Sequence, residues 1–119
     1  MPPAFLTSQP DANSLRVSIQ SGACNAESVC EELLTEVATR DPQLQAFAWL
    51  EPEHIRQQAQ RLDAQFARSG SVGPVHGLPM ALKDIIDTAG IPTENGTVLD
   101  AGRIPTRQAA VVELSLIHI

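Results

Sequence analysis

Lys83 is the side chain with the clearest capacity for chemistry, because it is the one lysine of the sequence and its neighbours are apolar. It lies in Gly77-Leu-Pro-Met-Ala-Leu-Lys-Asp-Ile-Ile86. Lysine is almost never fully buried without a partner, but unlike arginine it loses its proton readily when it is desolvated. The position therefore predicts either an ammonium that extends to solvent or a lysine buried for chemistry.

A neutral lysine amine is able to act as the base for a serine nucleophile. The serine hydroxyl is a weak nucleophile that needs a base within hydrogen-bonding reach, and a serine–lysine arrangement is a known alternative to serine–histidine. Burial in an apolar strand beside Leu82, Ile85 and Ile86 would disfavour the ammonium form. Alternation along such a strand sends Asp84 to the opposite face, so we expect Asp84 to bond loop amides instead.

The elements that must position Lys83 are predicted from caps, breakers and the spacing of apolar residues. Asp11 and Asn25 are suitable N-caps, the proline of Asp41-Pro42 disfavours helix in the residue before it, and Pro52 suits a first helical turn. Short apolar runs predict strands. We therefore expect helices over 11–20, 25–41, 52–69 and from near Gln108, with strands over 44–50 and 78–83. This alternation favours an α/β fold.

Composition and charge exclude several classes of function. The chain has 119 residues, enough for one small domain, and a net charge of −6, which argues against non-specific nucleic-acid binding. Cys24 and Cys30 match neither a zinc pattern nor a redox pair, so we expect reduced thiols and no metal. The sequence shows no signal peptide and no membrane-spanning run. We therefore expect a cytoplasmic protein that makes no membrane contact.

Several other side chains are candidates that we interpret as structural. His76 lies in a loop with no evident carboxylate partner, and we expect no catalytic role for it. His54 should face solvent in the first turn of the third helix, and Trp49 should lie in the core of the strand over 44–50. Arg103 and Arg107 are expected on a solvated loop face.

A run of small and apolar residues leads up to the lysine: Gly73-Pro-Val-His-Gly-Leu-Pro-Met-Ala-Leu-Lys-Asp84 fits the pattern G-P-x-x-G-x-P-x-x-x-K-D. With this motif, residues 73 to 113 closely resemble the first signature block of the amidase signature family. The order of elements upstream fits the same family from about residue 11. The resemblance implies that residues 11–113 are the N-terminal part of an α/β/α fold with a mixed central sheet, after a flexible terminus at 1–10.

The resemblance also implies a reaction. Members of the family hydrolyse amides, or release ammonia from glutamine as a subunit of a tRNA-dependent amidotransferase. They use a serine nucleophile, a second serine preceded by a cis peptide bond, and a lysine whose position Lys83 occupies. Both serines lie downstream in the family, in a segment that this sequence lacks. The implied substrate is a small-molecule amide, with no cofactor, and the intact protein is a candidate homodimer.

Asn95, Gly96 and Thr97 are a second candidate site. In the family this stretch runs close to the catalytic centre, which implies that these small residues line the substrate channel. The dipeptide Asn-Gly also favours positive φ and is typical of a plain turn. Both interpretations stay open from the sequence.

The C-terminal hexapeptide Leu114-Ser-Leu-Ile-His-Ile119 does not continue the polar pattern before it and looks like a translated sequencing adapter. We expect residues 114–119 to be non-native and the chain alone to be inactive, because it holds the base without the nucleophile.

Two functions remain as alternatives to an amidase that acts alone. The first is the amidase-type subunit of a glutamyl- or aspartyl-tRNA amidotransferase, which would work with partner proteins on a tRNA-linked substrate. The second is a non-catalytic small α/β binding module.

Overall fold

The computed structural model describes residues 11–71 and 73–113. The expected flexible terminus at 1–10 and the expected non-native tail at 114–119 lie outside the described residues. The chain divides into two compact units, Met1–Pro79 and Met80–Ile119. Each unit is described by itself.

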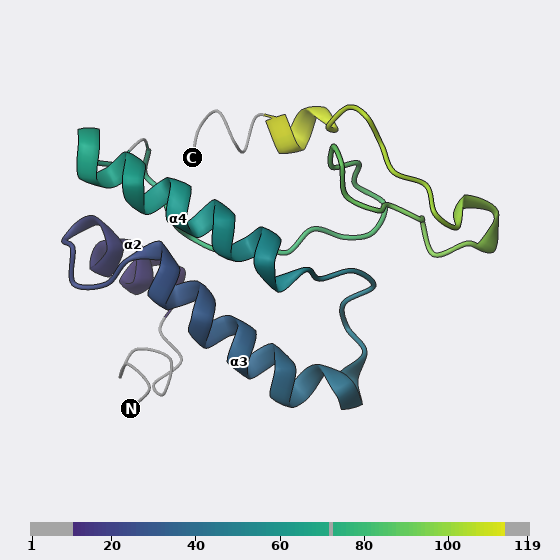
Figure 1. The fold of residues 1–119 in the computed structure, drawn as a ribbon, viewed down its shortest axis with the longest axis horizontal. Helices are drawn as coiled ribbons and strands as arrows, with labels where there is room; N and C mark the ends of the chain where they lie inside the picture. Colours follow the sequence, from purple (N-terminus) through teal and green to yellow (C-terminus); the bar gives the residue numbers. More distant parts are fainter. Residues whose placement is uncertain (1–10, 72, 114–119) are drawn as a thin grey trace. The chain divides into compact units, whose positions relative to one another are not determined.

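The first unit is built on three helices, α2 (Ala12–Gln20), α3 (Ala26–Leu44) and α4 (Pro52–Ser69). The carboxylate of Asp11 accepts the Ser14 N–H at 2.7 Å, so the predicted cap of the first helix is confirmed. Asn25 caps α3 in a capping box with Ser28. Figure 1 shows α3 and α4 side by side, and the predicted helices over 11–20 and 52–69 are confirmed.

The predicted end of α3 at Asp41-Pro42 is wrong, because the helix continues to Leu44 with Pro42 inside its last turns. A proline this close to a helix end removes one of the last intrahelical bonds, which costs less than in a helix interior. Gln45 then ends the helix in the left-handed conformation at φ 50°, and its N–H bonds the Asp41 carbonyl at 2.7 Å. The Asp41 carboxylate accepts the Ala46 N–H at 2.7 Å, which fixes the exit of the chain.

Helices α3 and α4 run antiparallel and are joined by polar contacts along the N-terminal third of α3. Glu27 bonds Gln60 at 3.3 Å and Glu31 pairs with Arg56, so residues later in α3 meet residues earlier in α4. The Asp63 carboxylate caps the N-terminus of α3 from the side, since it accepts the N–H groups of Ala26 at 2.8 Å and of Glu27 at 2.9 Å. A side chain from one helix thus satisfies the exposed donors of the other.

The core of this unit is small and made of aliphatic side chains. One buried cluster holds Leu15, Ile19 and Val29, and a second holds Ala26, Cys30 and Ala59. Gly77 packs directly on α2, because a Cβ built there at its φ of +80° would lie 3.2 Å from Ile19 Cγ2. The close approach of the 73–79 segment to the helices therefore depends on that glycine.

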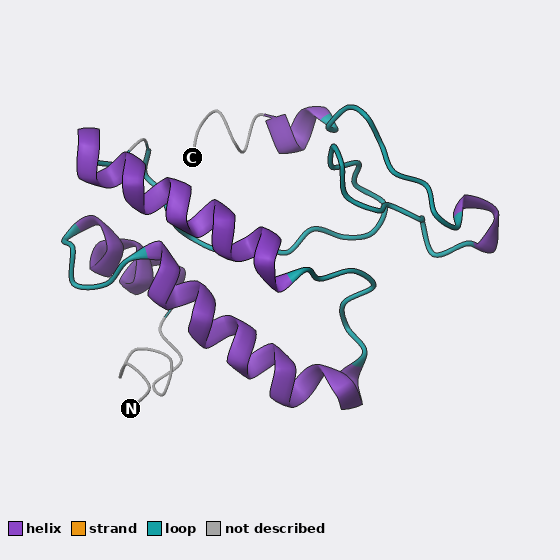
Figure 2. Cartoon of the chain, viewed as in Figure 1, coloured by secondary structure: helices purple, strands orange, loops and turns teal. Residues whose placement is uncertain are grey.

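Both predicted strands are wrong for the part of the chain that the structure describes. Figure 2 shows helices and loops in the described ranges, and no strand among them. Leu44 belongs to α3, residues 45–50 form a loop, and residues 78–83 are irregular. A strand requires a neighbouring backbone for its N–H and C=O groups, and neither segment pairs with one. The expected mixed sheet is therefore not found in these residues.

The surroundings of Trp49 and His54 also differ from those expected, a strand core for Trp49 and solvent for His54. Trp49 is half-buried in the loop before α4, and its ring meets that of His54 edge-on at a centroid distance of 5.7 Å. His54 is half-buried as well, and its Nε2 is buried without a hydrogen-bond partner. Without a strand, the tryptophan covers the first turn of α4 instead of entering a sheet core.

The second unit is mostly turns. A short 3₁₀ helix, η1 (Val98–Asp100), is capped by the Thr97 hydroxyl, and residues 110–113 are helical, two residues later than predicted. Thr93 and Val112 are buried within the described part of this unit. No helix in the described ranges has the length and hydropathy needed to cross a bilayer.

We predict that Asp63→Ala lowers the free energy of unfolding by about 1 kcal/mol, because α3 loses its side-on cap. Urea denaturation followed by circular dichroism measures this loss. The matched control is Gln58→Ala, an exposed position of α4 that should change stability by less than about 0.5 kcal/mol. Equal effects of the two substitutions would contradict a capping role for Asp63.

Candidate functional site

Lys83 is exposed in the structure, and Met80, Leu82 and Ile85 beside it are exposed too. Its carbonyl accepts the Ile86 N–H at 3.0 Å, so a turn begins at the lysine. The expected burial of Lys83 in an apolar strand is wrong for the described residues. The physical reason is that an unpaired segment has no neighbouring strand to shield either face.

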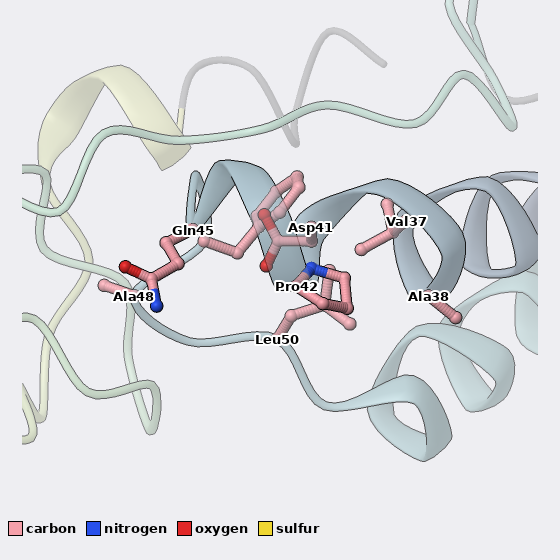
Figure 3. Close-up of a pocket in the computed structure, with 8 residues that line it drawn as sticks. Val37, Ala38, Asp41, Pro42, Gln45, Ala48 and Leu50 are labelled. Carbon is pink, nitrogen blue, oxygen red and sulfur yellow. The ribbon is translucent and has the colours of Figure 1, made fainter.

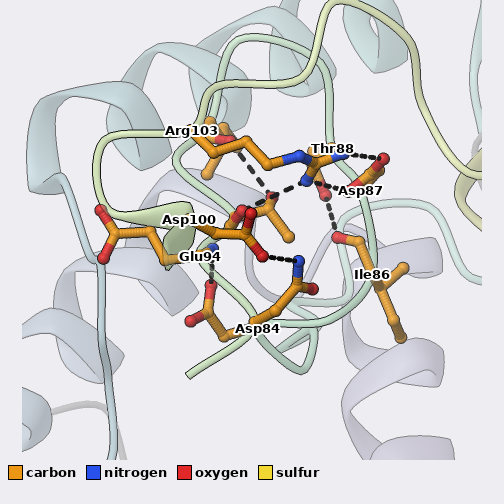
Figure 4. A network of polar contacts seen from close by, with 10 residues as sticks. Asp84, Ile86, Asp87, Thr88, Glu94, Asp100 and Arg103 are labelled. Carbon is orange, nitrogen blue, oxygen red and sulfur yellow. Dashed lines mark hydrogen bonds and ion pairs between the residues drawn. The ribbon is translucent and has the colours of Figure 1, made fainter. Parts of the chain in front are cut away.

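Asp84 connects the lysine segment to the stretch around Asn95. Its Oδ1 accepts the Glu94 N–H at 3.0 Å, and its carbonyl accepts the Asn95 N–H at 2.9 Å. Figure 4 shows the Asp84 carboxylate directed at Glu94. The prediction that Asp84 bonds loop amides is confirmed, and the bonds bring the two candidate sites, Lys83 and Asn95, into one neighbourhood.

Asn95 and Gly96 form a tight turn. They have φ values of 55° and 68°, and the Thr97 N–H bonds the Glu94 carbonyl at 3.1 Å. Positive φ at both central residues is typical of a type I′ turn and explains the Asn-Gly sequence. The Thr97 hydroxyl accepts the Leu99 N–H at 3.3 Å. The predicted turn is confirmed, and a substrate-lining role for these residues stays a prediction.

Asp87 and Arg103 form a bidentate ion pair that sequence reasoning missed. Arg103 donates to the Asp87 carboxylate oxygens at 2.6 and 2.8 Å and to the Thr93 carbonyl at 3.2 Å. The Thr93 N–H returns a bond to the Arg103 carbonyl at 3.0 Å. The Arg103 side chain is still 38% exposed, so the expected solvated loop face holds and the ion pair is the unexpected feature. Arg107 is exposed as expected. No short-range pattern links residues 87 and 103, so the sequence held no signal for the pair.

This pairing has an electrostatic consequence for the carboxyl group. The hydrogen bonds from the Arg103 guanidinium, more than its charge alone, hold the pKa of Asp87 below its usual range. Burial acts in the opposite direction and is the weaker cause of the two. Asp87 is thus an ionised structural carboxylate at neutral pH.

The remaining candidates from the sequence are engaged in structure. His76 is 1% exposed, its Nε2 lies 3.1 Å from the Leu62 carbonyl oxygen, and its ring meets that of Phe66. Cys24 and Cys30 are free thiols, and burial raises the pKa of both, which disfavours the reactive thiolate. Within the described ranges no group of His, Cys, Asp and Glu side chains gathers in a way that would hold a metal ion.

A hollow of about 650 Å³ lies at the C-terminal end of α3 (Figure 3). It is lined mainly by apolar side chains: Val37, Ala38, Asp41, Pro42, Gln45, Phe47, Ala48 and Leu50. The carboxylate of Asp41 is already bonded to the Ala46 amide. The hollow therefore offers surface but no nucleophile or base.

Comparison with known proteins places this arrangement in a family. The family model described as Amidase matches residues 28–115, which include Lys83, Asp84 and the Asn95–Thr97 turn. The chain belongs to the amidase family. Its neighbours among solved structures agree with that membership, although the described residues of this amidase chain contain no strand.

Relatives of this amidase chain include components of larger enzymes. It is 34% identical over 102 residues to the A subunit of glutamyl-tRNA(Gln) amidotransferase from Acidothermus cellulolyticus, covering 86% of this chain and 20% of that protein. It is 35% identical over 79 residues to AtzE, which is a subunit of 1-carboxybiuret hydrolase from Pseudomonas sp. (strain ADP), covering 66% of this chain and 17% of that protein. The amidase chain thus spans about a fifth of the length of such relatives.

The solved structures that match this chain are also much longer than it. One is described as a vestigial protein complex that reveals the evolutionary origins of an s-triazine catabolic enzyme. It matches with a TM-score of 0.79 and 29% identity, over 87% of this chain and 23% of that one. An inhibitor-bound form matches with a TM-score of 0.77 and 30% identity, over 85% of this chain and 22% of that one.

We predict that the Asp87–Arg103 pair makes stability depend on acid pH. Because the folded pKa of Asp87 lies below its unfolded value, the stabilisation is present above about pH 4 and is lost as pH falls through the folded pKa. The difference in melting temperature between the parent and Asp87→Asn should therefore be largest near pH 7 and shrink below pH 4. Calorimetry across that range measures it.

Arg107→Gln serves as the matched control for Arg103→Gln, since Arg107 is exposed. The Arg103 variant should behave like Asp87→Asn, and the Arg107 variant like the parent. A melting difference for Asp87→Asn that stays constant from pH 3 to pH 7 would contradict the assignment.

Proposed function

We propose that the intact protein hydrolyses a carboxamide, with Lys83 as the base for a serine supplied by sequence beyond these residues. The observation that carries the proposal is the pattern Gly73-Pro-x-x-Gly-x-Pro-x-x-x-Lys83-Asp84, which lies inside the match to the amidase family. On this proposal residues 11–113 are the N-terminal part of an amidase domain. Family membership favours an enzyme over a non-catalytic binding module.

The proposed chemistry follows from what a lysine amine is able to do. The neutral amine of Lys83 takes a proton, relayed through a second serine, from the hydroxyl that attacks the amide carbon. The C–N bond breaks as the same proton returns to the leaving amine, and water then releases the acyl group. Arginine would not serve, because its guanidinium does not lose its proton.

The base needs dry surroundings, which we propose come from the mixed central sheet of the intact fold. Support for this comes from the apolar side chains that the second unit leaves exposed, among them Met80, Leu82 and Ile85 next to the lysine. A neighbouring strand that covered these side chains would also remove Lys83 from water. The desolvated ammonium would then be disfavoured.

A second candidate is ammonia release from glutamine within a tRNA-dependent amidotransferase. Two relatives that are named as components of glutamyl-tRNA(Gln) amidotransferases, at 34% and 31% identity, support it. The reaction at the serine would be the same, and the partner proteins would supply the tRNA-linked substrate. A homodimer suits the stand-alone amidase, whereas a mixed complex suits the amidotransferase.

In the intact protein we predict that Lys83→Ala and Lys83→Arg each lower amide hydrolysis by about 1,000-fold or more. Ammonia release from acetamide, benzamide and L-glutamine measures the loss. A melting temperature close to the parent value in both variants would show that the loss comes from the missing amine and not from unfolding. Arg61→Ala removes another exposed cation and should retain activity. Parent-level turnover in Lys83→Ala would remove this lysine from the mechanism.

Glutamine distinguishes the two candidate functions. For a stand-alone amidase we expect ammonia release from acetamide or benzamide by the purified protein alone. For a component of an amidotransferase we expect release from L-glutamine, rising when the proteins encoded beside it and charged tRNA are added. Turnover of simple amides without any partner would contradict the amidotransferase role.

A further inference from the structure

Asp84 fixes the distance between the lysine segment and the Asn95–Gly96 turn. The Asp84 carboxylate bonds the Glu94 N–H at 3.0 Å, and the Asp84 carbonyl bonds the Asn95 N–H at 2.9 Å. Lys83 is the residue directly before Asp84. Any shift of the turn relative to Asp84 is therefore also a shift relative to the backbone that carries the lysine.

The turn is held on its other side as well. The Glu94 carboxylate accepts the Gly102 N–H at 2.9 Å, and the Asn95 side-chain amide donates to the Asp100 carboxylate at 2.9 Å. The turn thus belongs to a network that extends to residue 102. Asp84 is the point at which this network meets the lysine segment.

We propose that Asp84 is a positioning residue for amide hydrolysis, acting as the hydrogen-bond acceptor that sets Lys83 relative to the Asn95–Gly96 turn. The inference rests on the proposed function of Lys83. A displacement of about 1 Å at a reacting group is enough to lower a rate on the order of 100-fold. Holding the lysine through a neighbour on the chain is one way to prevent that displacement.

The acceptor oxygen of Asp84, and not its negative charge, carries the role. A carboxylate that paired with the lysine would favour the ammonium form and oppose a neutral base. The structure instead directs Oδ1 to the Glu94 amide. Asparagine keeps an acceptor oxygen at this position and removes the charge, so the two contributions are separable.

The test compares Asp84→Ala with Asp84→Asn in the intact enzyme, using the amide among acetamide, benzamide and L-glutamine that is turned over fastest. We expect Asp84→Ala to lower kcat on the order of 100-fold with KM changed only a few-fold. Asp84→Asn should stay within a few-fold of the parent. The pH midpoint of the rate profile should stay in place in Asp84→Asn, whereas a charge acting on Lys83 would move it.

Hydrogen exchange and one control separate positioning from general loss of stability. The peptide that contains Glu94 and Asn95 should exchange faster in Asp84→Ala than in the parent or in Asp84→Asn. Asp63→Ala removes another carboxylate that accepts backbone N–H groups, at α3, and should leave kcat at the parent value.

Each outcome bears on the inference. Parent-level kcat in Asp84→Ala, or a 100-fold loss in Asp84→Asn, would overturn it, and the asparagine variant decides the matter if the alanine variant does not fold. If Lys83→Ala is inactive while Asp84→Ala is fully active, only the positioning role fails. If Lys83→Ala is active, the proposed function itself fails.

Discussion

The hydrogen bonds that Asp84 and Asp87 accept fix the backbone after Lys83. Asp84 uses its carboxylate and its carbonyl for Glu94 and Asn95. Asp87 uses its carboxylate for Arg103 and its carbonyl for the Ala109 N–H at 2.8 Å. Two acids three positions apart therefore connect the lysine segment to residues 94–95 and to residues 103 and 109 of the second unit. The carboxylates and backbone carbonyls of these two residues hold the segments together here, as ladder bonds do in a sheet.

Polar contacts matter this much because the second unit buries little apolar surface. Val98 and Leu99 are 90% and 91% exposed, and Met80, Leu82 and Ile85 are exposed around the lysine. Apolar burial normally supplies the main stabilisation of a fold. A unit that exposes these side chains is held in shape by its hydrogen bonds, and it presents an apolar surface next to its one lysine.

The sequence predicted the helices well and the strands poorly, for a physical reason. A helix satisfies its own backbone, so the caps at Asp11 and Asn25 and the Pro52 start determine it locally. An apolar run such as 78–83 indicates a need for burial, but a strand also needs a partner that no local pattern specifies. The same limit hid the Asp87–Arg103 pair, whereas the local Asn95-Gly96 turn and the amide bonding of Asp84 were predictable.

The acids around Lys83 are arranged in a way that suits a base. A carboxylate beside an amine stabilises the ammonium, so acids next to a catalytic lysine would normally oppose its function. Here the Asp84 oxygen faces the Glu94 amide at 3.0 Å, and the Asp87 oxygens face the Arg103 guanidinium at 2.6 and 2.8 Å. Backbone donors and an arginine that never gives up its proton engage these charges. The acids thus order the lysine segment while their hydrogen bonds go to the Glu94 N–H and the Arg103 guanidinium.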